Sequence, residues 1–445
     1  MYHKIVRILW GDLSKEDLKK FSLLATGFFF LIGAWWPLKT LKDSIFINIV
    51  GSTYIPKAKI ASLILFFPLV LMYSKLVDIV SKEKLIYLFI TFYGAIGLAL
   101  VYFLYHPTIG LANPTVDPSR WLGWILYLYA ESFISLMLSL YWSFINDVTT
   151  PESAKKGYGL IIFGTQFGGL LFTIWGNILS YDTTRYAQTA PFIILVCVLT
   201  FFLVGLIVFI LERSVDKKQL AGYQDRSGQD KITQPEAIIG FFDGLKLLFT
   251  QPYVAGIFGL ICFQEIISTM MGFQMNLLVS QTYSDPGMVN RFLFNFAFCV
   301  QIIACLFGLV GTSFFQRIFG IRFCLISYPI LLGLSILGYL FYPTLGSIFC
   351  VMLIAKALNY ALNQPAKEVL YIPTSRNIKY KSKAWIDMFG LRFAKAAGAT
   401  ANDWVGTFVS LTGGLALGLI AVWSVMAGII GTKFKKTVDQ NKMIE

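Results

Sequence analysis

The chain has 445 residues, of which 56% are hydrophobic and only 14% are charged, and its formal net charge is +13. Soluble domains carry about 25% charged residues, so this composition excludes a soluble globular protein. Apolar stretches of about 20 residues, the length that crosses the roughly 30 Å hydrocarbon layer, recur along the whole chain. This recurrence excludes a soluble enzyme held by a single anchor and indicates a multi-pass membrane protein.

Hydropathy and helix-breaking residues predict an all-α integral membrane protein with twelve spans. In chain order we expect them at 21–40, 59–80, 85–105, 121–145, 158–180, 190–211, 253–280, 292–315, 323–342, 346–370, 384–411 and 413–432. The residues before the first span are polar and basic and lack the short apolar core of a cleavable signal. The first span is therefore expected to act as its own insertion signal.

Positive charge is concentrated in every second loop, for example at Lys82, Lys84, Lys155 and Lys156. Loops rich in lysine and arginine stay on the cytoplasmic side, so both termini and the central loop are predicted to be cytoplasmic. This topology accounts for much of the net charge and makes nucleic acid an unexpected partner. We expect the inner membrane of a bacterium as the location.

A polar stretch, residues 212–236, divides the twelve predicted spans six and six. We predict an N-terminal six-helix half at 1–211, a cytoplasmic linker with a short amphipathic helix at 212–248, and a C-terminal six-helix half at 249–445. This layout is that of major-facilitator transporters, in which the substrate site lies near the bilayer midplane between the halves. A monomer is expected.

Ionisable residues inside the spans are the main candidates for a site. Each costs at least about 2.5–3.5 kcal/mol near a helix centre, so it usually faces a cavity or a partner. They are Lys39, Lys42, Asp43, Glu131, Asp147, Glu265, Lys356, Lys367, Glu368, Asp387, Arg392, Lys395 and Asp403. Histidine and cysteine lack the spacing of a metal site, and no cofactor is expected.

Two pairs of cations have helical spacing. Lys39 and Lys42 stand three residues apart, as do Arg392 and Lys395, so each pair shares a helix face. Like charges repel in a low dielectric, and phosphate groups would relieve this repulsion while accepting many hydrogen bonds. The alternative is that the side chains extend to the membrane interface, which is harder for Arg392 and Lys395 deep in their span.

Two glutamates lie within spans. Glu131 is central in WILYLYAESFISLMLSLYW, and three roles are open to it: carrying a proton, accepting from a substrate, or pairing with a cation such as Lys42. Glu265 lies nearer the cytoplasmic end of its span, where a structural ion pair and a coupling role are equally open. The aromatic residues that flank the Glu131 face and can stack on a flat base are Tyr127, Tyr129 and Trp142.

Three segments carry a family resemblance: PLKTLKDSIF at 37–46, YAESFISLMLSLYWSFINDVTT at 129–150, and YALNQPAKEVLYIPTSRNIKYKSKAWIDMFGLRFAKAAG at 360–398. They resemble the corresponding blocks of the ATP/ADP translocase family of plastids and obligate intracellular bacteria. The family has a twelve-helix major-facilitator-like fold and exchanges ATP for ADP plus phosphate, while some members import nucleotides with protons or carry NAD.

The resemblance implies substrate roles for five residues: Lys42, Glu131, Lys367, Arg392 and Lys395. It also implies that the Asn146 amide reads a base edge. The chain departs from the family at 272–276, where an acidic residue and a lysine are replaced by uncharged ones; Glu265 lies seven residues before this segment, two turns along the same face.

The predicted function is that of a nucleotide carrier, with ATP/ADP exchange as the leading mode. The alternative is a proton-coupled importer of a less charged nucleotide, NAD or another organic anion, with Glu131 or Glu265 as the proton carrier. An enzyme is not expected, because the chain has no GxxxxGK[ST] phosphate loop and no acidic cluster placed to hold Mg²⁺.

Overall fold

The computed structural model describes residues 15–149, 151–215, 250–310, 312–371 and 390–440, together with residues 248, 373, 374 and 386. The chain forms two compact units. Unit 1 comprises residues 1–51, 65–233 and 285–301, and unit 2 comprises 52–64, 234–284 and 302–445. Residues 216–247, which include most of the predicted linker and its amphipathic helix, lie outside the described residues.

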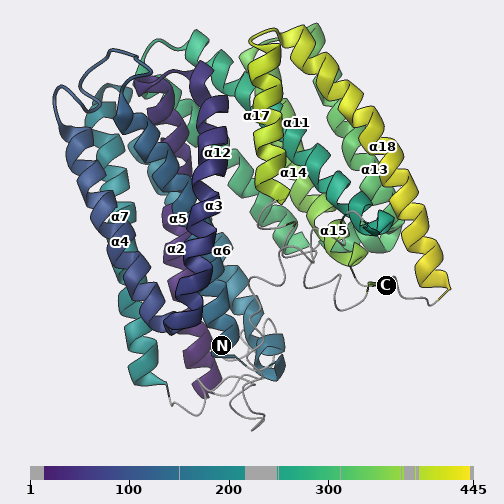
Figure 1. The fold of residues 1–445 in the computed structure, drawn as a ribbon, viewed down its shortest axis with the longest axis horizontal. Helices are drawn as coiled ribbons and strands as arrows, with labels where there is room; N and C mark the ends of the chain where they lie inside the picture. Colours follow the sequence, from purple (N-terminus) through teal and green to yellow (C-terminus); the bar gives the residue numbers. More distant parts are fainter. Residues whose placement is uncertain are drawn as a thin grey trace. The chain divides into compact units, whose positions relative to one another are not determined.

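Unit 1 is a bundle of long helices (Figure 1). Its complete helices are α2 (Lys15–Ile49), α4 (Lys82–Tyr105), α5 (Trp121–Asp147), α6 (Pro151–Leu179) and α7 (Tyr186–Ser214). The helices α3 (Ile55–Ile79) and α12 (Pro286–Val310) each contribute one part to unit 1 and one part to unit 2. Helix α2 contacts α5, α6 and α7, so it forms the centre of the unit.

Unit 2 is also helical, with α11 (Pro252–Thr282) contacting α14, α17 and α18. Its other helices are α13 (Thr312–Phe341), α14 (Leu345–Leu358), α15 (Gln364–Leu370), α17 (Leu391–Val405) and α18 (Val409–Asp439). A π-helical turn, Asn359–Asn363, separates α14 from α15. The sequence predicts one continuous span at 346–370, and the structure instead divides it at this turn.

Ten helices of the described part of the chain are long and apolar enough to cross a membrane. Many of their large apolar side chains are exposed, among them Ile64 at 68% and Leu334 at 59%. Such exposure on long apolar helices is expected where the surrounding medium is lipid. The protein is therefore a multi-pass integral membrane protein, as the sequence predicts.

Two glycines allow α6 to approach the backbone of α2. Gly164 and Gly168 have the GxxxG spacing that brings membrane helices together. A Cβ atom at either position would lie closer than 3.0 Å to the backbone oxygen of Ala25 or Phe29. This close packing fixes α2 within unit 1, and the same helix carries Lys42 toward α5.

Candidate functional site

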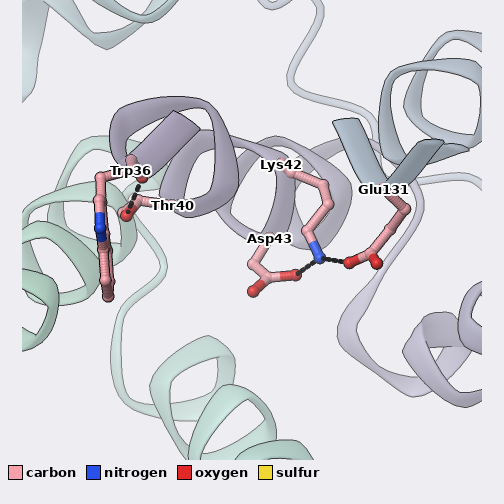
Figure 2. A network of polar contacts seen from close by, with 5 residues as sticks. All are labelled: Trp36, Thr40, Lys42, Asp43 and Glu131. Atoms are coloured by element: carbon pink, nitrogen blue, oxygen red, sulfur yellow. Dashed lines mark hydrogen bonds and ion pairs between the residues drawn. The ribbon is translucent and has the colours of Figure 1, made fainter. Parts of the chain in front are cut away.

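The first candidate site lies in unit 1, where α2 packs against α5 (Figure 2). The Nζ atom of Lys42 donates to Oε1 of Glu131 at 2.6 Å and lies 3.2 Å from Oδ1 of Asp43. The Lys42 side chain is only 6% exposed, whereas those of Asp43 and Glu131 are 27% and 28% exposed. Of the three roles predicted for Glu131, the structure shows the ion pair with Lys42.

An aromatic ring completes the surroundings of the Lys42 ammonium group. Its Nζ atom lies 4.1 Å from the centroid of the Tyr127 ring. Tyr127 precedes Glu131 by one helical turn on α5, so both side chains face α2. The electron-rich ring and the two carboxylates offset the cost of removing an ammonium group from water. Lys42 must therefore exchange or share a partner in order to bind an anion.

Lys39 takes a different direction from Lys42, although the two residues are three positions apart on α2. Its Nζ atom lies 4.9 Å from the ring centroid of Trp35 and 4.8 Å from that of Trp36. The side chain is half-buried. The structure thus places the two lysines among different neighbours, and the helical spacing alone did not predict this separation.

The aromatic residues near Glu131 are not equivalent. Tyr127 and Tyr129 are buried in unit 1, and the Tyr129 hydroxyl donates to the backbone oxygen of Tyr93 at 3.0 Å. Both rings pack against other side chains, and stacking of either ring on a base stays a prediction. Trp142 is half-buried, and its ring centroid lies 5.8 Å from that of Tyr158.

Asn146 lies at the end of α5 beside this aromatic pair. Its Oδ1 atom accepts a hydrogen bond from the Tyr158 hydroxyl at 2.6 Å, and this hydroxyl also lies 3.2 Å from that of Thr149. Asn146 is exposed. The Tyr158 hydroxyl occupies the amide oxygen of Asn146 and leaves its nitrogen as a donor, and Trp142 lies one helical turn earlier on α5.

The second candidate site lies in unit 2 and is centred on Gln264 of α11. The Oε1 atom of Gln264 accepts from Nζ of Lys367 and from Nδ2 of Asn363, both at 3.1 Å, and its Nε2 atom donates to Oε1 of Glu265 at 3.1 Å. Asn363 belongs to the π-helical turn and also donates to Asn359 at 2.9 Å. Such π turns occur frequently at functional sites.

Lys356 extends this cluster from α14. Its Nζ atom donates to the Ser268 hydroxyl at 3.3 Å, and Glu265 and Lys395 are close enough to act on it electrostatically. Lys356 is one of the ionisable candidates that the sequence indicates, whereas Gln264 was not predicted as a site residue. The signal for Gln264 was its position four residues before Ser268, which places two polar side chains on one face of an apolar helix.

Helix α17 carries Arg392 and Lys395. Gly398 and Ala399 follow Lys395 by three and four residues and are buried, so Lys395 shares their helix face. Lys395 itself is nevertheless exposed, whereas Arg392 is half-buried. Lys395 is thus exposed although it lies on the helix face that packs on α11. The first residues of the predicted span, including Asp387, lie outside the described residues.

The fold defines the class of protein. The structure matches a bacterial homologue of the human lysosomal transporter Spinster with a TM-score of 0.60 and 13% identity, covering 97% of this chain and 100% of the other. It also matches a mutant of the nucleoside transporter NupG with a TM-score of 0.56 and 13% identity, covering 95% of this chain and 100% of the other. The fold is that of the major-facilitator-type transporters. Helical units with charged residues inside the spans agree with this fold.

The family follows from the sequence comparisons. Residues 1–352 and 342–434 match the TLC ATP/ADP transporter family, and the chain belongs to this family. It is 24% identical to ADP,ATP carrier protein 2, chloroplastic, of Arabidopsis thaliana, over 96% of this chain and 76% of that protein. It is also 24% identical to ADP,ATP carrier protein 4 of Rickettsia conorii, over 89% of this chain and 86% of the relative. The resemblance expected from the sequence is confirmed.

Proposed function

We propose that this protein carries nucleotides across a membrane by alternating access, with ATP/ADP exchange as its reaction. The observation that carries the proposal is the presence in a TLC-family chain of buried or half-buried cations inside the spans of both units, Lys42 in one and Lys356 and Lys367 in the other. Buried cations of this kind mark the pathway of an anionic substrate.

The proposed topology has twelve spans in two six-helix halves, residues 1–211 and 249–445, joined by the linker at 212–248. Both termini face the cytoplasm, and the protein is a monomer in a bacterial inner membrane. Support comes from the alternation of basic and non-basic loops, and from relatives in Rickettsia. In this proposal the two predicted spans that are not among the ten long apolar helices contain the shorter helices α14 and α17.

In the proposed mechanism the cations of unit 2 bind the phosphate groups. Lys356 and Lys367 donate to oxygens of Ser268 and Gln264, and in this mechanism phosphate oxygens replace these acceptors. The exposed Lys395 is proposed to bind a terminal phosphate, and Arg392 lies one turn before it. A hydrogen bond from an ammonium group to a charged phosphate oxygen is stronger than the bond to a neutral oxygen that it replaces.

The Lys42–Glu131 pair of unit 1 has a different role in this mechanism. A phosphate that approaches Lys42 competes with Glu131. The released Glu131 carboxylate can then accept a hydrogen bond from a substrate hydroxyl or take up a proton. Without substrate the pair stays closed, so that the empty carrier reorients slowly and the loaded carrier reorients rapidly. Exchange follows from this difference. Lys39 adds positive charge beside the pathway, and Asn146 with Trp142 receives the base.

The test is uptake of radiolabelled ATP into liposomes that contain the purified protein. We expect uptake only when ADP or ATP is present inside, and its inhibition by external ADP. Exchange of ATP with four charges for ADP with three is also driven by voltage, at about 2.3 kcal/mol per charge per 100 mV. Inorganic phosphate inside the liposomes tests whether it serves as a co-substrate. Uptake that is independent of internal nucleotide would contradict exchange.

The second candidate function is proton-coupled import of a less charged nucleotide or NAD. Two observations favour it. Uncharged residues stand at 272–276, where the family has an acidic residue and a lysine, and the carboxylates of Glu131 and Glu265 are partly exposed inside spans. Uptake driven by a pH gradient into empty liposomes, and lost in Glu131→Gln or Glu265→Gln, would establish it in place of exchange.

A further inference from the structure

A groove at the end of α18 lies apart from the substrate cluster described above. It has a volume of about 500 Å³ and is lined by residues of α13 and α18, two helices that lie side by side in unit 2 (Figure 1). Its lining includes three cations, Arg322, Lys433 and Lys436, and two branched apolar residues, Val425 and Ile429. Among the seven lining residues none is acidic.

The three cations converge from two helices. Lys433 and Lys436 are three residues apart on one face of α18, and Arg322 comes from α13. Gly431 lets the helices approach, since a Cβ atom there would lie 3.0 Å from Cγ of Arg322. Lys433 is also held beside α11, with its Nζ atom 5.9 Å from the Tyr253 ring centroid. Three like charges brought this close favour an anionic occupant.

The other end of the groove is apolar and faces the surroundings. Val425 and Ile429 are 64% and 61% exposed, and they precede Lys433 by eight and four residues on the same face of α18. Helix α18 has 31 residues, about 46 Å, which exceeds the roughly 30 Å hydrocarbon layer. The apolar residues therefore lie at the depth of acyl chains, and the lysines lie at the depth of headgroups.

We propose that this groove binds an anionic phospholipid, with the headgroup phosphate on Arg322, Lys433 and Lys436 and an acyl chain along Val425 and Ile429. A soluble phosphate compound matches only the charged end, whereas a phospholipid matches both ends. Basic pockets between membrane helices bind anionic headgroups in this way. With the C-terminus on the cytoplasmic side, the lipid belongs to the inner leaflet. The lipid site is separate from the nucleotide site and does not depend on it.

The experiment measures lipid retention by the full-length protein in detergent, using native mass spectrometry with added phosphatidylglycerol or phosphatidylcholine. We expect selective retention of phosphatidylglycerol, and its loss in the Lys433→Gln/Lys436→Gln variant, by about five-fold for each cation removed. The matched control is Lys435→Gln, because Lys435 is an exposed lysine on the same turn of α18 that does not line the groove.

Equal loss in Lys436→Gln and Lys435→Gln would show that only the net charge of the helix end attracts the lipid, and would overturn the proposal. Equal retention of the two lipids by the wild-type protein would do the same. If the double variant does not fold, the comparison of the single variants Lys436→Gln and Lys435→Gln still decides, with a five-fold difference expected. An intact protein that transports nucleotide without selective phosphatidylglycerol binding would leave the proposed transport standing and refute the lipid site.

Discussion

In unit 1 the buried lysine faces two carboxylates, whereas in unit 2 the lysines of the cluster donate to neutral oxygens. Lys42 lies 2.6 Å from Glu131 and 3.2 Å from Asp43. Lys356 donates to a serine hydroxyl at 3.3 Å and Lys367 to an amide oxygen at 3.1 Å. These hydrogen-bond acceptors thus differ in charge: a carboxylate for Lys42, and neutral oxygens for Lys356 and Lys367, with the charge of Glu265 also acting on Lys356.

This difference separates two functions that one lysine cannot easily combine. A carboxylate at 2.6 Å cancels most of the positive potential, and an arriving phosphate must displace it. A hydroxyl or amide oxygen stabilises the ammonium group without cancelling its charge, so the potential extends to an approaching anion. Under the proposed function, the unit 2 lysines attract phosphate, and the Lys42–Glu131 pair of unit 1 opens when phosphate arrives.

The largest effect is expected for Glu131→Gln. Lys42 would lose its shortest ion pair while buried, and we expect the free energy of unfolding to fall by about 3 kcal/mol. Exchange should fall about 100-fold, which corresponds to the loss of one charged hydrogen bond. Thermal unfolding in detergent and ATP uptake measure the two effects. Asp43→Asn is the matched control, with the same change of charge at the longer distance, and equal effects of both variants would contradict a special role of Glu131.

Replacing both members of the pair sharpens the same test. Each single variant leaves one charged side chain at the 2.6 Å contact without its charged partner, whereas Lys42→Gln/Glu131→Gln removes both charges. The double variant should therefore be more stable than the sum of the single variants predicts, by about 2 kcal/mol. Strict additivity would show that the two side chains do not interact in the membrane-embedded protein. Transport should stay lost in all three variants.

The next effect is expected for Gln264→Glu, which would replace the amide acceptor of Lys367 by a carboxylate, the type of acceptor that Lys42 has in unit 1. We expect the KM for ATP to rise about 10-fold or more, because the ion pair competes with phosphate. The unfolding temperature should not increase, because the new carboxylate replaces the amide that donates to Glu265. Gln264→Leu is the contrasting variant: it removes the acceptor of Lys367 and Asn363 and should lower the free energy of unfolding by about 1–3 kcal/mol. An unchanged KM in Gln264→Glu would break the comparison between the units.

A smaller effect is expected for Lys356→Gln. The new amide can still donate to Ser268, so the fold should keep its unfolding temperature, whereas the KM for ATP should rise about 10-fold through the loss of one charged contact. Ser268→Ala is the control, since it removes the partner and keeps the charge, and its KM should stay within about two-fold of wild type. A larger effect of Ser268→Ala than of Lys356→Gln would mean that the hydrogen bond matters rather than the charge.

Lys395→Gln tests the phosphate end of the proposed site. Because Lys395 is exposed, its charge is partly screened, and we expect about a five-fold weaker binding of ATP. Binding of adenosine, which has no phosphate, should not change. Isothermal titration with both compounds measures the difference. Equal losses for ATP and adenosine would show that Lys395 is not a phosphate ligand.

The smallest effect is expected for Asn146→Ala. Loss of one neutral hydrogen bond to a base should reduce the preference for ATP over GTP about three- to five-fold, as competition between the two nucleotides in uptake measures. Tyr158→Phe removes the hydroxyl that orients the Asn146 amide, and it should shift the preference in the same direction by less. A preference that is unchanged in Asn146→Ala would place base recognition elsewhere.

Sequence reasoning predicted the helices well and their ends less well. The first span was expected at 21–40, and α2 extends over Lys15–Ile49. Hydropathy falls at Lys39, Lys42 and Asp43, so the pattern indicates an end there. The helix continues because tertiary contacts compensate these charges: Trp35 and Trp36 lie beneath Lys39, and Glu131 pairs with Lys42. Likewise, the apolar run at 346–370 gives no sign of the π-helical turn Asn359–Asn363.

The sequence by itself determined that this chain is a membrane protein, where its helices lie, which side chains carry charge inside them, and to which family it belongs. These properties depend on composition, on local periodicity and on motifs, which are all read along the chain. Only the tertiary structure decided that Lys42 meets Glu131, 89 positions away, and that Lys367 meets Gln264, 103 positions away. Coulomb and hydrogen-bond energies depend on distances between atoms in space, and helix packing sets those distances.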